Sequence, residues 1–178
     1  MITSFLPIRK MWIFSLQTQP PMPLGKIIDI VVEPKKGEIK AVWVQTLDGL
    51  RLVDFADIQR LTKKEAYISH QHDLCTPESL PKLRHTLENE VRIISADVFV
   101  KESEKNRKIG MVVDFVFDTT ILRISAIVVQ KRGWFWGEKI EIPRVRILEI
   151  NEDGVFVSNN EILVTEKKGD PSIVPSLD

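Results

Sequence analysis

The chain has 178 residues, of which 43% are hydrophobic and 28% charged, as in an ordinary globular protein with one domain or two small ones. Its 25 Lys and Arg balance 25 Asp and Glu, so it lacks the excess of positive charge that nucleic-acid-binding proteins normally carry. We therefore expect a protein partner, with RNA as an alternative and no DNA. The single cysteine, Cys75, excludes an internal disulfide and fits a reducing compartment.

The apolar start of the chain is interrupted by Pro7, Arg9 and Lys10, and no cleavage site of small residues follows. We therefore expect no signal peptide. No stretch approaches the roughly 20 apolar residues that a membrane-spanning helix needs. The expected location is the cytoplasm, in solution or at the periphery of a membrane.

The most informative pattern is an internal repeat. Residues 24–33 read LGKIIDIVVE and residues 109–118 read IGMVVDFVFD, at an offset of 85. Two polar or special residues also fall in register, namely Gly25 with Gly110 and Asp29 with Asp114. Further along, DFADIQRL resembles EIPRVRIL at an offset of 87, and AYIS resembles VFVS at 89. Loops of different length between two copies of one unit produce such a drift, so the sequence predicts a tandem duplication.

Each copy predicts a series of short strands. The segments are rich in β-branched and aromatic residues and are separated by turn residues such as Asp48-Gly49. The expected strands are 10–16, 27–34, 38–46, 51–55 and 66–70 in the first copy, and 91–100, 112–119, 123–131, 139–143 and 154–159 in the second. Many short strands with turns between them favour a mainly β fold built from two tandem small antiparallel β-barrels.

These patterns divide the chain into a first domain at 1–75, a linker at 76–90, a second domain at 91–163 and a mobile tail at 164–178. Thr76 followed by Pro77 is typical of a helix start, with the threonine as the N-cap. An apolar stripe follows at Leu80, Leu83 and Leu87. The linker is therefore expected to form a short helix that packs against the end of a barrel.

The segments 24–44 and 109–129 resemble the PRC-barrel family. This small barrel occurs in the cytoplasmic domain of the photosynthetic reaction centre H subunit and in the C-terminal domain of a ribosome maturation factor. GWFWGEKIEIPRVRI, residues 133–147, fits the later part of the family pattern, whereas the first copy lacks WFWG and has Ala56 where Pro143 stands. The resemblance implies two PRC-barrel-like domains that act as docking modules, without a shared catalytic constellation.

Three consecutive aromatic residues, Trp134, Phe135 and Trp136, stand between two glycines in the second copy. Alternation along a strand would place both tryptophans on one face and the phenylalanine on the other. They could pack in the core or between the barrels. Together with Lys131 and Arg132 they could instead bind a partner, because Trp and Arg are enriched at interface hot spots.

HQHDLC, residues 70–75, is the only segment that suggests metal or nucleophile chemistry. At strand spacing His70 and His72 would share a face, with Cys75 close by and His85 in the linker as a further ligand. A zinc site normally has three or four protein ligands at a characteristic spacing, and this segment lacks that spacing. We therefore expect a polar strand end, with no metal, no cofactor and no catalytic residue.

The sequence thus favours a non-catalytic docking or assembly module, with a protein partner that could belong to a membrane-associated complex of the photosynthetic type. An RNA- or ribosome-associated maturation factor is the alternative, and a metal- or cysteine-dependent enzyme is the third hypothesis. The RNA hypothesis predicts one basic face formed by Lys35, Lys36, Lys131, Arg132, Arg144 and Arg146.

Overall fold

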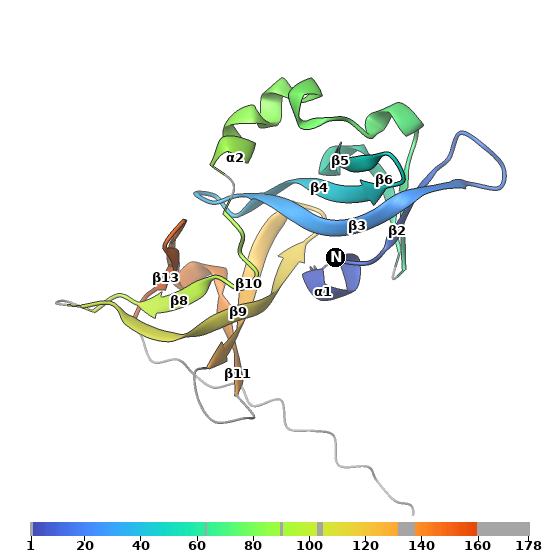
Figure 1. Ribbon diagram of the computed structural model, residues 1–178. Coiled ribbons are helices and arrows are strands. Elements are labelled where there is room, and N and C mark those ends of the chain that lie inside the picture. Colours follow the sequence, from blue (N-terminus) through green and yellow to red (C-terminus); the bar gives the residue numbers. More distant parts are fainter. Residues whose placement is uncertain (1, 63, 90, 103–104, 132–137, 160–178) are drawn as a thin grey trace, which may run out of the picture.

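The computed structural model describes residues 2–159 except positions 63, 90, 103–104 and 132–137 (Figure 1). Its thirteen strands belong to one mixed sheet. They are β1 (Ile2–Ser4), β2 (Trp12–Ser15), β3 (Met22–Glu33), β4 (Glu38–Thr46), β5 (Gly49–Asp54), β6 (Ile58–Leu61), β7 (Glu65–Ile68), β8 (Asp97–Val100), β9 (Arg107–Asp118), β10 (Arg123–Lys131), β11 (Lys139–Pro143), β12 (Ile147–Asn151) and β13 (Gly154–Val157).

The described helices are short. They are α1 (Phe5–Ile8), α2 (Arg84–Glu88) and five 3-10 turns, η1 (Phe55–Asp57), η2 (Gln71–Asp73), η3 (Pro77–Ser79), η4 (Pro81–Leu83) and η5 (Arg144–Arg146). The prediction of a mainly β protein is therefore confirmed.

The repeat seen in the sequence reappears in the strand pairing. The first half runs β6-β7-β2-β3-β4 with β5 on β4, and the second runs β12-β13-β8-β9-β10 with β11 on β10. In both halves one pair is parallel, β2 with β7 and β8 with β13. The same connections therefore build the same arrangement of strands twice.

The strand registers correct part of the sequence alignment. Gln45 pairs with Leu50 in the first half, and Gln130 pairs with Lys139 in the second. The second hairpin loop is thus four residues longer, and the offset passes from 85 directly to 89. The offset of 87 for residues 54–61 is wrong, and the counterpart of Ala56 is Val145 instead of Pro143. The strand alternation survives a shift of two residues, which is why the sequence alone allowed this error.

Irregular positions of the backbone also repeat. Shifts in strand register leave one extra residue at Leu24, Ile28, Lys40 and Gln59 in the first half, and at Ile109, Val113, Ser125 and Leu148 in the second. Such bulges bend a strand and increase its twist. Gly25 and Gly110 lie beside the first bulge, where a Cβ atom would collide with the carbonyl oxygen of Gln45 or Gln130. The backbone of the neighbouring strand therefore leaves no room for a side chain at either glycine.

The two halves join through the hairpins that follow β3 and β9. Glu38 of β4 pairs with Arg123 of β10. Ile39 donates its backbone N–H to the carbonyl of Leu122 at 2.7 Å, and Ile124 donates to the carbonyl of Gly37 at 2.9 Å. Arg123 is the counterpart of Glu38 at an offset of 85, and the two backbone hydrogen bonds are counterparts of each other at the same offset. The halves are therefore related by a local two-fold axis at this point.

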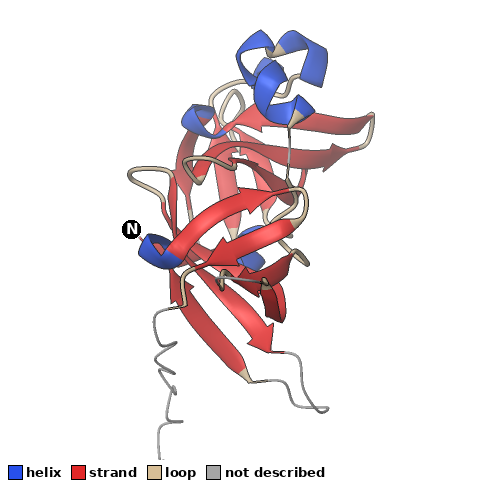
Figure 2. Ribbon diagram, turned by 90° about the vertical axis from the view of Figure 1, so that its left-hand side faces the viewer, coloured by secondary structure: helices blue, strands red, loops and turns tan. Residues whose placement is uncertain are grey.

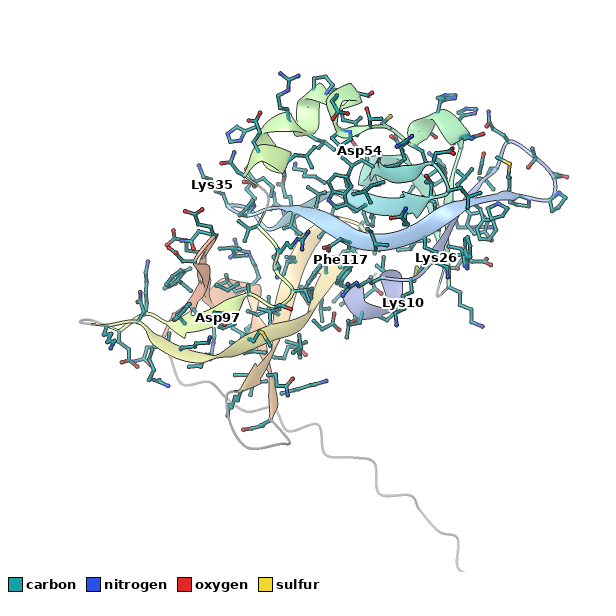
Figure 3. The ribbon with its side chains drawn as sticks, in the orientation of Figure 1. Lys10, Lys26, Lys35, Asp54, Asp97 and Phe117 are labelled. Atoms are coloured by element: carbon teal, nitrogen blue, oxygen red, sulfur yellow. The ribbon has the colours of Figure 1, made fainter. Side chains whose placement is uncertain are left out.

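The expectation of two closed tandem barrels is wrong. The sheet is open, and it continues from one half into the other across β4 and β10. Buried apolar residues of both halves form one continuous cluster. Phe5 stacks on Phe115 at 4.8 Å between ring centroids, and Phe55 meets Phe117 edge-on at 5.9 Å. Figure 3 shows Phe117 between the strands of the two halves. Sharing one core buries apolar surface that two separate barrels would leave exposed.

The linker covers the outer face of the first half, on the side of β3, β4 and β5 away from the main core (Figure 2). Its turns η3 and η4 and the helix α2 bring Leu80, Leu83 and Leu87 against Val31 and Ala41. The predicted apolar stripe is therefore confirmed. The predicted cap is not, because the Thr76 hydroxyl lies 3.0 Å from the Ser79 hydroxyl and makes no capping hydrogen bond.

Candidate functional site

A cleft of about 750 Å³ lies where the two halves and the linker meet. One wall is the tip of the β3–β4 hairpin, where Figure 3 shows Lys35. The second wall is α2, and the third comes from η5 and β12 of the second half. The cleft therefore exists only because the halves are held together.

Arg144 ties the walls of this cleft together. Its Nη1 donates to the carbonyl of Ile147 at 2.8 Å, and its Nη2 donates to the carbonyl of Lys35 in the other half at 3.3 Å. The hairpin itself is fixed by Glu33, whose carboxylate accepts the backbone N–H groups of Lys35 and Lys36 at 3.2 and 2.9 Å. Hydrogen bonds that involve a charged group are the stronger kind, so this wall is well defined.

Carboxylates outnumber cations in the cleft. Its charged lining residues are Glu33, Glu88, Glu149, Glu152, Lys35 and Arg144. A hydrogen bond from Asn151, together with the ion pair to Lys101 at 3.3 Å, lowers the pKa of Glu149, so this carboxylate is ionised at neutral pH. His85 contacts Asn89 with 2.7 Å between Nδ1 and Nδ2. The cleft therefore offers mainly hydrogen-bond acceptors and negative charge to a bound group.

The hairpin of β10 and β11 holds the sequence-predicted aromatic segment. Arg132, Trp134, Phe135 and Trp136 lie outside the described residues, and only Lys131 of that set can be placed. Its backbone N–H donates to the carbonyl of Glu138 at 2.9 Å, and its Nζ lies 2.7 Å from a Glu138 carboxylate oxygen. One backbone hydrogen bond and one ion pair therefore hold the base of the hairpin together. In Figure 1 the described ends of the two strands project away from the body of the molecule.

The described members of the predicted basic face do not come together. Lys35 and Arg144 meet in the cleft, among the carboxylates named above. Lys131 and Arg123 lie at opposite ends of the nine-residue strand β10, roughly 26 Å apart. Arg123 is beside the junction, so Lys131 is far from the junction. Lys131 is also paired with Glu138. These residues therefore form two separate regions instead of one continuous basic surface.

HQHDLC does not form the predicted strand end. The 3-10 turn η2 occupies its middle, because the Asp73 carboxylate accepts the backbone N–H of His70 at 2.8 Å. The two histidine rings stack with centroids 4.8 Å apart. Within the described parts of the chain, no three His, Cys, Asp or Glu side chains gather in a way that could hold a metal ion.

Hydrogen bonds hold both the backbone and the thiol of Cys75. Its backbone N–H and carbonyl exchange hydrogen bonds with Leu52 of β5, both at 2.8 Å, and its thiol donates to the carbonyl of His72 at 3.4 Å. Burial, with smaller contributions from Asp57 and Asp73, raises the pKa of the thiol. The nucleophilic thiolate is therefore disfavoured at neutral pH.

The repeated aspartates belong to different halves and organise the backbone. Asp29 accepts the N–H of Ile30 at 2.9 Å, and Asp114 accepts the N–H of Phe115 at 2.8 Å. Asp114 also accepts the Ser4 hydroxyl and the N–H of Leu6, and so holds the N-terminal segment on the second half. The sequence contained no signal for this clamp, nor for the cleft, because the residues that form them are far apart in the chain.

Comparison with profiles of known protein families finds no match for this chain. A search of curated proteins likewise finds no significantly similar sequence. No helix in the described ranges combines the length and apolar character needed to cross a membrane.

Proposed function

We propose that the protein is a non-catalytic docking or assembly module that binds a protein partner through the β10–β11 hairpin. The observation that carries this proposal is the difference between the two equivalent hairpins. The loop of the first half is short, and its Leu47 is 104% exposed, which places that loop outside the core. The second loop has four more residues and contains two tryptophans, a phenylalanine and an arginine.

The hairpin base suits such a role. Lys131 and Glu138 hold the ends of β10 and β11 together, so a partner would meet a loop whose attachment is already fixed. A fixed attachment reduces the conformational entropy lost on binding. Trp and Arg carry much of the binding energy in known interfaces. The resemblance to PRC-barrel sequences supports the same proposal, because those domains are known mainly as docking modules.

The proposed partner is a protein, and the proposed setting is the cytoplasm or the cytoplasmic periphery of a membrane complex. The zero net charge and the carboxylate-rich cleft support a protein partner over RNA. Strong RNA binding would require a continuous basic surface to neutralise phosphates, and the described basic residues are divided between two regions.

The test is affinity purification of the full chain from the lysate of its own host, with and without ribonuclease. Trp134→Ala/Trp136→Ala is compared with Leu47→Ala, the matched change in the loop of the first half. We expect a defined set of proteins to bind in a ribonuclease-resistant manner and to be reduced at least about tenfold by the double variant only, which is about 1.4 kcal/mol of binding energy.

The melting temperature of both variants should stay within about 2 °C of the wild type, since the proposal places the rings outside the core. A large drop for the double variant alone would instead assign the tryptophans to packing and contradict the proposal. Recovery dominated by RNA, and lost after ribonuclease or at high salt, would replace the protein partner by an RNA.

A further inference from the structure

Two equivalent strands, β5 and β11, each lie at an edge of the sheet. β5 pairs with β4, and β11 pairs with β10 in the corresponding register. In the first half, Leu52 of β5 exchanges backbone hydrogen bonds with Cys75 on its other side, both at 2.8 Å. This contact is a short antiparallel bridge. The edge of β5 therefore accepts a further antiparallel segment.

The corresponding edge of β11 is open in the described part of the chain. Among the described strands, only β10 pairs with β11. Glu141 of β11 faces Val128 as Leu52 faces Trp43 in the first half, but no described residue takes the position of Cys75. Figure 1 shows β11 at the end of the molecule away from the first half. A neighbouring molecule can therefore approach this edge without displacing the linker.

The pairing of β10 with β11 shows which backbone groups face the open edge. The N–H of Lys131 donates to the carbonyl of Glu138 at 2.9 Å, so these two residues form a hydrogen-bonded pair. Bonded and non-bonded pairs alternate along an antiparallel ladder. Ile140 therefore bonds to β10, whereas Lys139 and Glu141 on either side of it point their N–H and carbonyl groups to the open edge. Such unpaired groups are a template for a second strand.

The side chains along this edge alternate between exposed charge and buried apolar surface. Lys139 and Glu141 are exposed on the outer face, and Ile140 between them is buried in the core. Neither charged side chain forms an ion pair or a hydrogen bond with another side chain of the described residues. Both charges are therefore available to a strand that pairs with the open edge.

One antiparallel register brings opposite charges together between two copies of β11. A two-fold dimer pairs the same edge of both molecules. With the axis at Ile140, Lys139 stands opposite Glu141 of the second copy, and the reverse pair forms on the other side of the axis. With the axis one residue away on either side, Glu141 would face Glu141 or Lys139 would face Lys139. Like charges directly opposite each other destabilise a strand pair.

We infer that the open edge of β11 binds β11 of a second copy of this chain, in the register that pairs Lys139 with Glu141. Both residues present an N–H and a carbonyl to the edge, so each pair exchanges both backbone hydrogen bonds. The two ion pairs lie on the outer face, where both side chains are exposed. The sheet then continues from one molecule into the other, as it continues from one half into the other within the chain.

The inference does not depend on the proposed docking function. Dimerisation uses the edge of β11, whereas the proposed partner binds the loop that precedes this strand. A chain that forms no dimer can still bind a partner through the loop, and a chain that binds no partner can still dimerise. The two proposals can therefore fail separately.

The expected dimer is weak, because each copy contributes one short strand. Interfaces below the standard size are typical of transient complexes. Charged residues and prolines commonly protect edge strands from pairing, and Lys139, Glu141 and Pro143 protect β11 against strands of unmatched charge. A second copy in the matched register is the exception. We therefore expect dimers at high protein concentration, and fewer of them at high salt, which screens the ion pairs.

The test is sedimentation equilibrium of the full chain at low salt, at concentrations up to about 1 mM. We expect a reversible equilibrium between monomer and dimer. Lys139→Glu and Glu141→Lys each oppose like charges across the axis and should raise the dissociation constant at least about tenfold. The double variant Lys139→Glu/Glu141→Lys restores opposite charges in the same register and should return the constant to within about threefold of the wild type.

Leu50→Glu is the matched control. Leu50 of β5 faces Gln45 as Lys139 of β11 faces Gln130, and the edge of β5 is occupied by Cys75. This variant adds a charge at the equivalent position of the first half and should leave the equilibrium unchanged. A monomer at every concentration would overturn the inference. A dimer that the single charge reversals do not weaken, or that the double variant does not recover, would also overturn it.

Hydrogen exchange tests the position and register of the contact. The amides of Lys139 and Glu141 should exchange more slowly as the protein concentration rises, because they bond to the second copy. The amide of Ile140 should exchange slowly at every concentration, because it bonds to β10. Slow exchange of Lys139 and Glu141 in the monomer would show that the chain covers this edge itself, and would overturn the inference.

Discussion

The two halves of this protein share a backbone plan and differ in the residues that cross between them. At the first position after β5, Phe55 places its ring against Phe117 of the other half. At the first position after β11, its counterpart Arg144 reaches back to the carbonyl of Lys35. One crossing contact is apolar and buried, and the other is polar and lines the cleft.

This difference shows which parts of a duplicated unit are free to change. The bulges and the close-packed glycines occupy the same positions in both halves, because they set the path of the strands. Lys10 and Ser95 are also counterparts, and both have positive φ values, of 112° and 71°. The crossing residues Phe55 and Arg144 have no such restriction. Phe55 therefore contributes to the shared core, whereas its counterpart Arg144 lines the polar cleft.

The sharpest test of the comparison is the pair of crossing residues. Phe55→Ala should lower the free energy of unfolding by about 3–5 kcal/mol, because it leaves a cavity against Phe117 in the shared core. Arg144→Ala should cost about 1–3 kcal/mol, since it removes two hydrogen bonds from a charged donor. Urea unfolding followed by fluorescence measures both. Equal losses would mean that the two crossing contacts contribute alike and that the comparison is wrong.

The glycines test the shared part of the plan. Gly25→Ala and Gly110→Ala each place a methyl group against a backbone carbonyl that cannot move aside, and each should cost about 2–3 kcal/mol. Because the strand path is the same, we expect the two losses to agree within about 0.5 kcal/mol. Thermal unfolding of the two variants side by side checks this. A loss at one position only would show that the two halves tolerate backbone shifts differently.

Much of the fold could be predicted from the sequence because local patterns determine it. The β-branched segments, the Asp48-Gly49 turn and the leucine stripe of the linker are all local signals, and the structure follows them. The duplication could also be predicted, since Gly25 and Gly110 stand in register at positions where a side chain does not fit. The predicted strand at residues 91–100 is too long. Only Asp97–Val100 forms β8. Ser95 adopts a positive φ, which prevents the strand from starting earlier.

The union of the halves could not be predicted, because it depends on contacts between residues far apart in the chain. Phe5 and Phe115 are both ordinary apolar residues in sequence, and no spacing rule links them. The cleft has the same origin, since Lys35 and Arg144 meet only after the halves have joined. The predicted strand conformation at His70 and His72 is wrong for a local reason, because Asp73 caps a 3-10 turn there. A sequence pattern of period two cannot show such a turn.

A third prediction compares the two repeated aspartates. Asp114→Asn should cost about 1–3 kcal/mol, because it removes the charge that accepts hydrogen bonds from Ser4, Leu6 and Phe115. Asp29→Asn should cost about 0.5–1 kcal/mol, since among the described residues only the N–H of Ile30 donates to that carboxylate. Hydrogen exchange adds a second readout, because the Leu6 amide should lose protection in the first variant alone. Similar losses of stability in the two variants would contradict the role of Asp114 in holding the N-terminal segment.

The weakest effect concerns the two-fold junction, where Glu38 meets its own counterpart Arg123. Hydrogen bonds from Lys40 and then Arg123 lower the pKa of Glu38 from 4.5 to about 2. A lowered carboxyl pKa adds stability above the unfolded value, and this stability is lost as the pH falls from about 4.5 towards 2. Since Arg123 is half exposed, solvent screening reduces the contribution to about 1 kcal/mol.

Glu38→Gln should remove this contribution at neutral pH and leave stability near pH 2 almost unchanged. The curves of unfolding free energy against pH for the wild type and the variant should therefore converge in acid. Curves that stay parallel across this range would show that the ionised carboxylate does not stabilise the junction. The charge-swapped pair Glu38→Arg/Arg123→Glu places an arginine beside Lys40, so it should recover only part of the loss. Full recovery of the unfolding free energy would show that the ion pair contributes equally in either orientation across the junction.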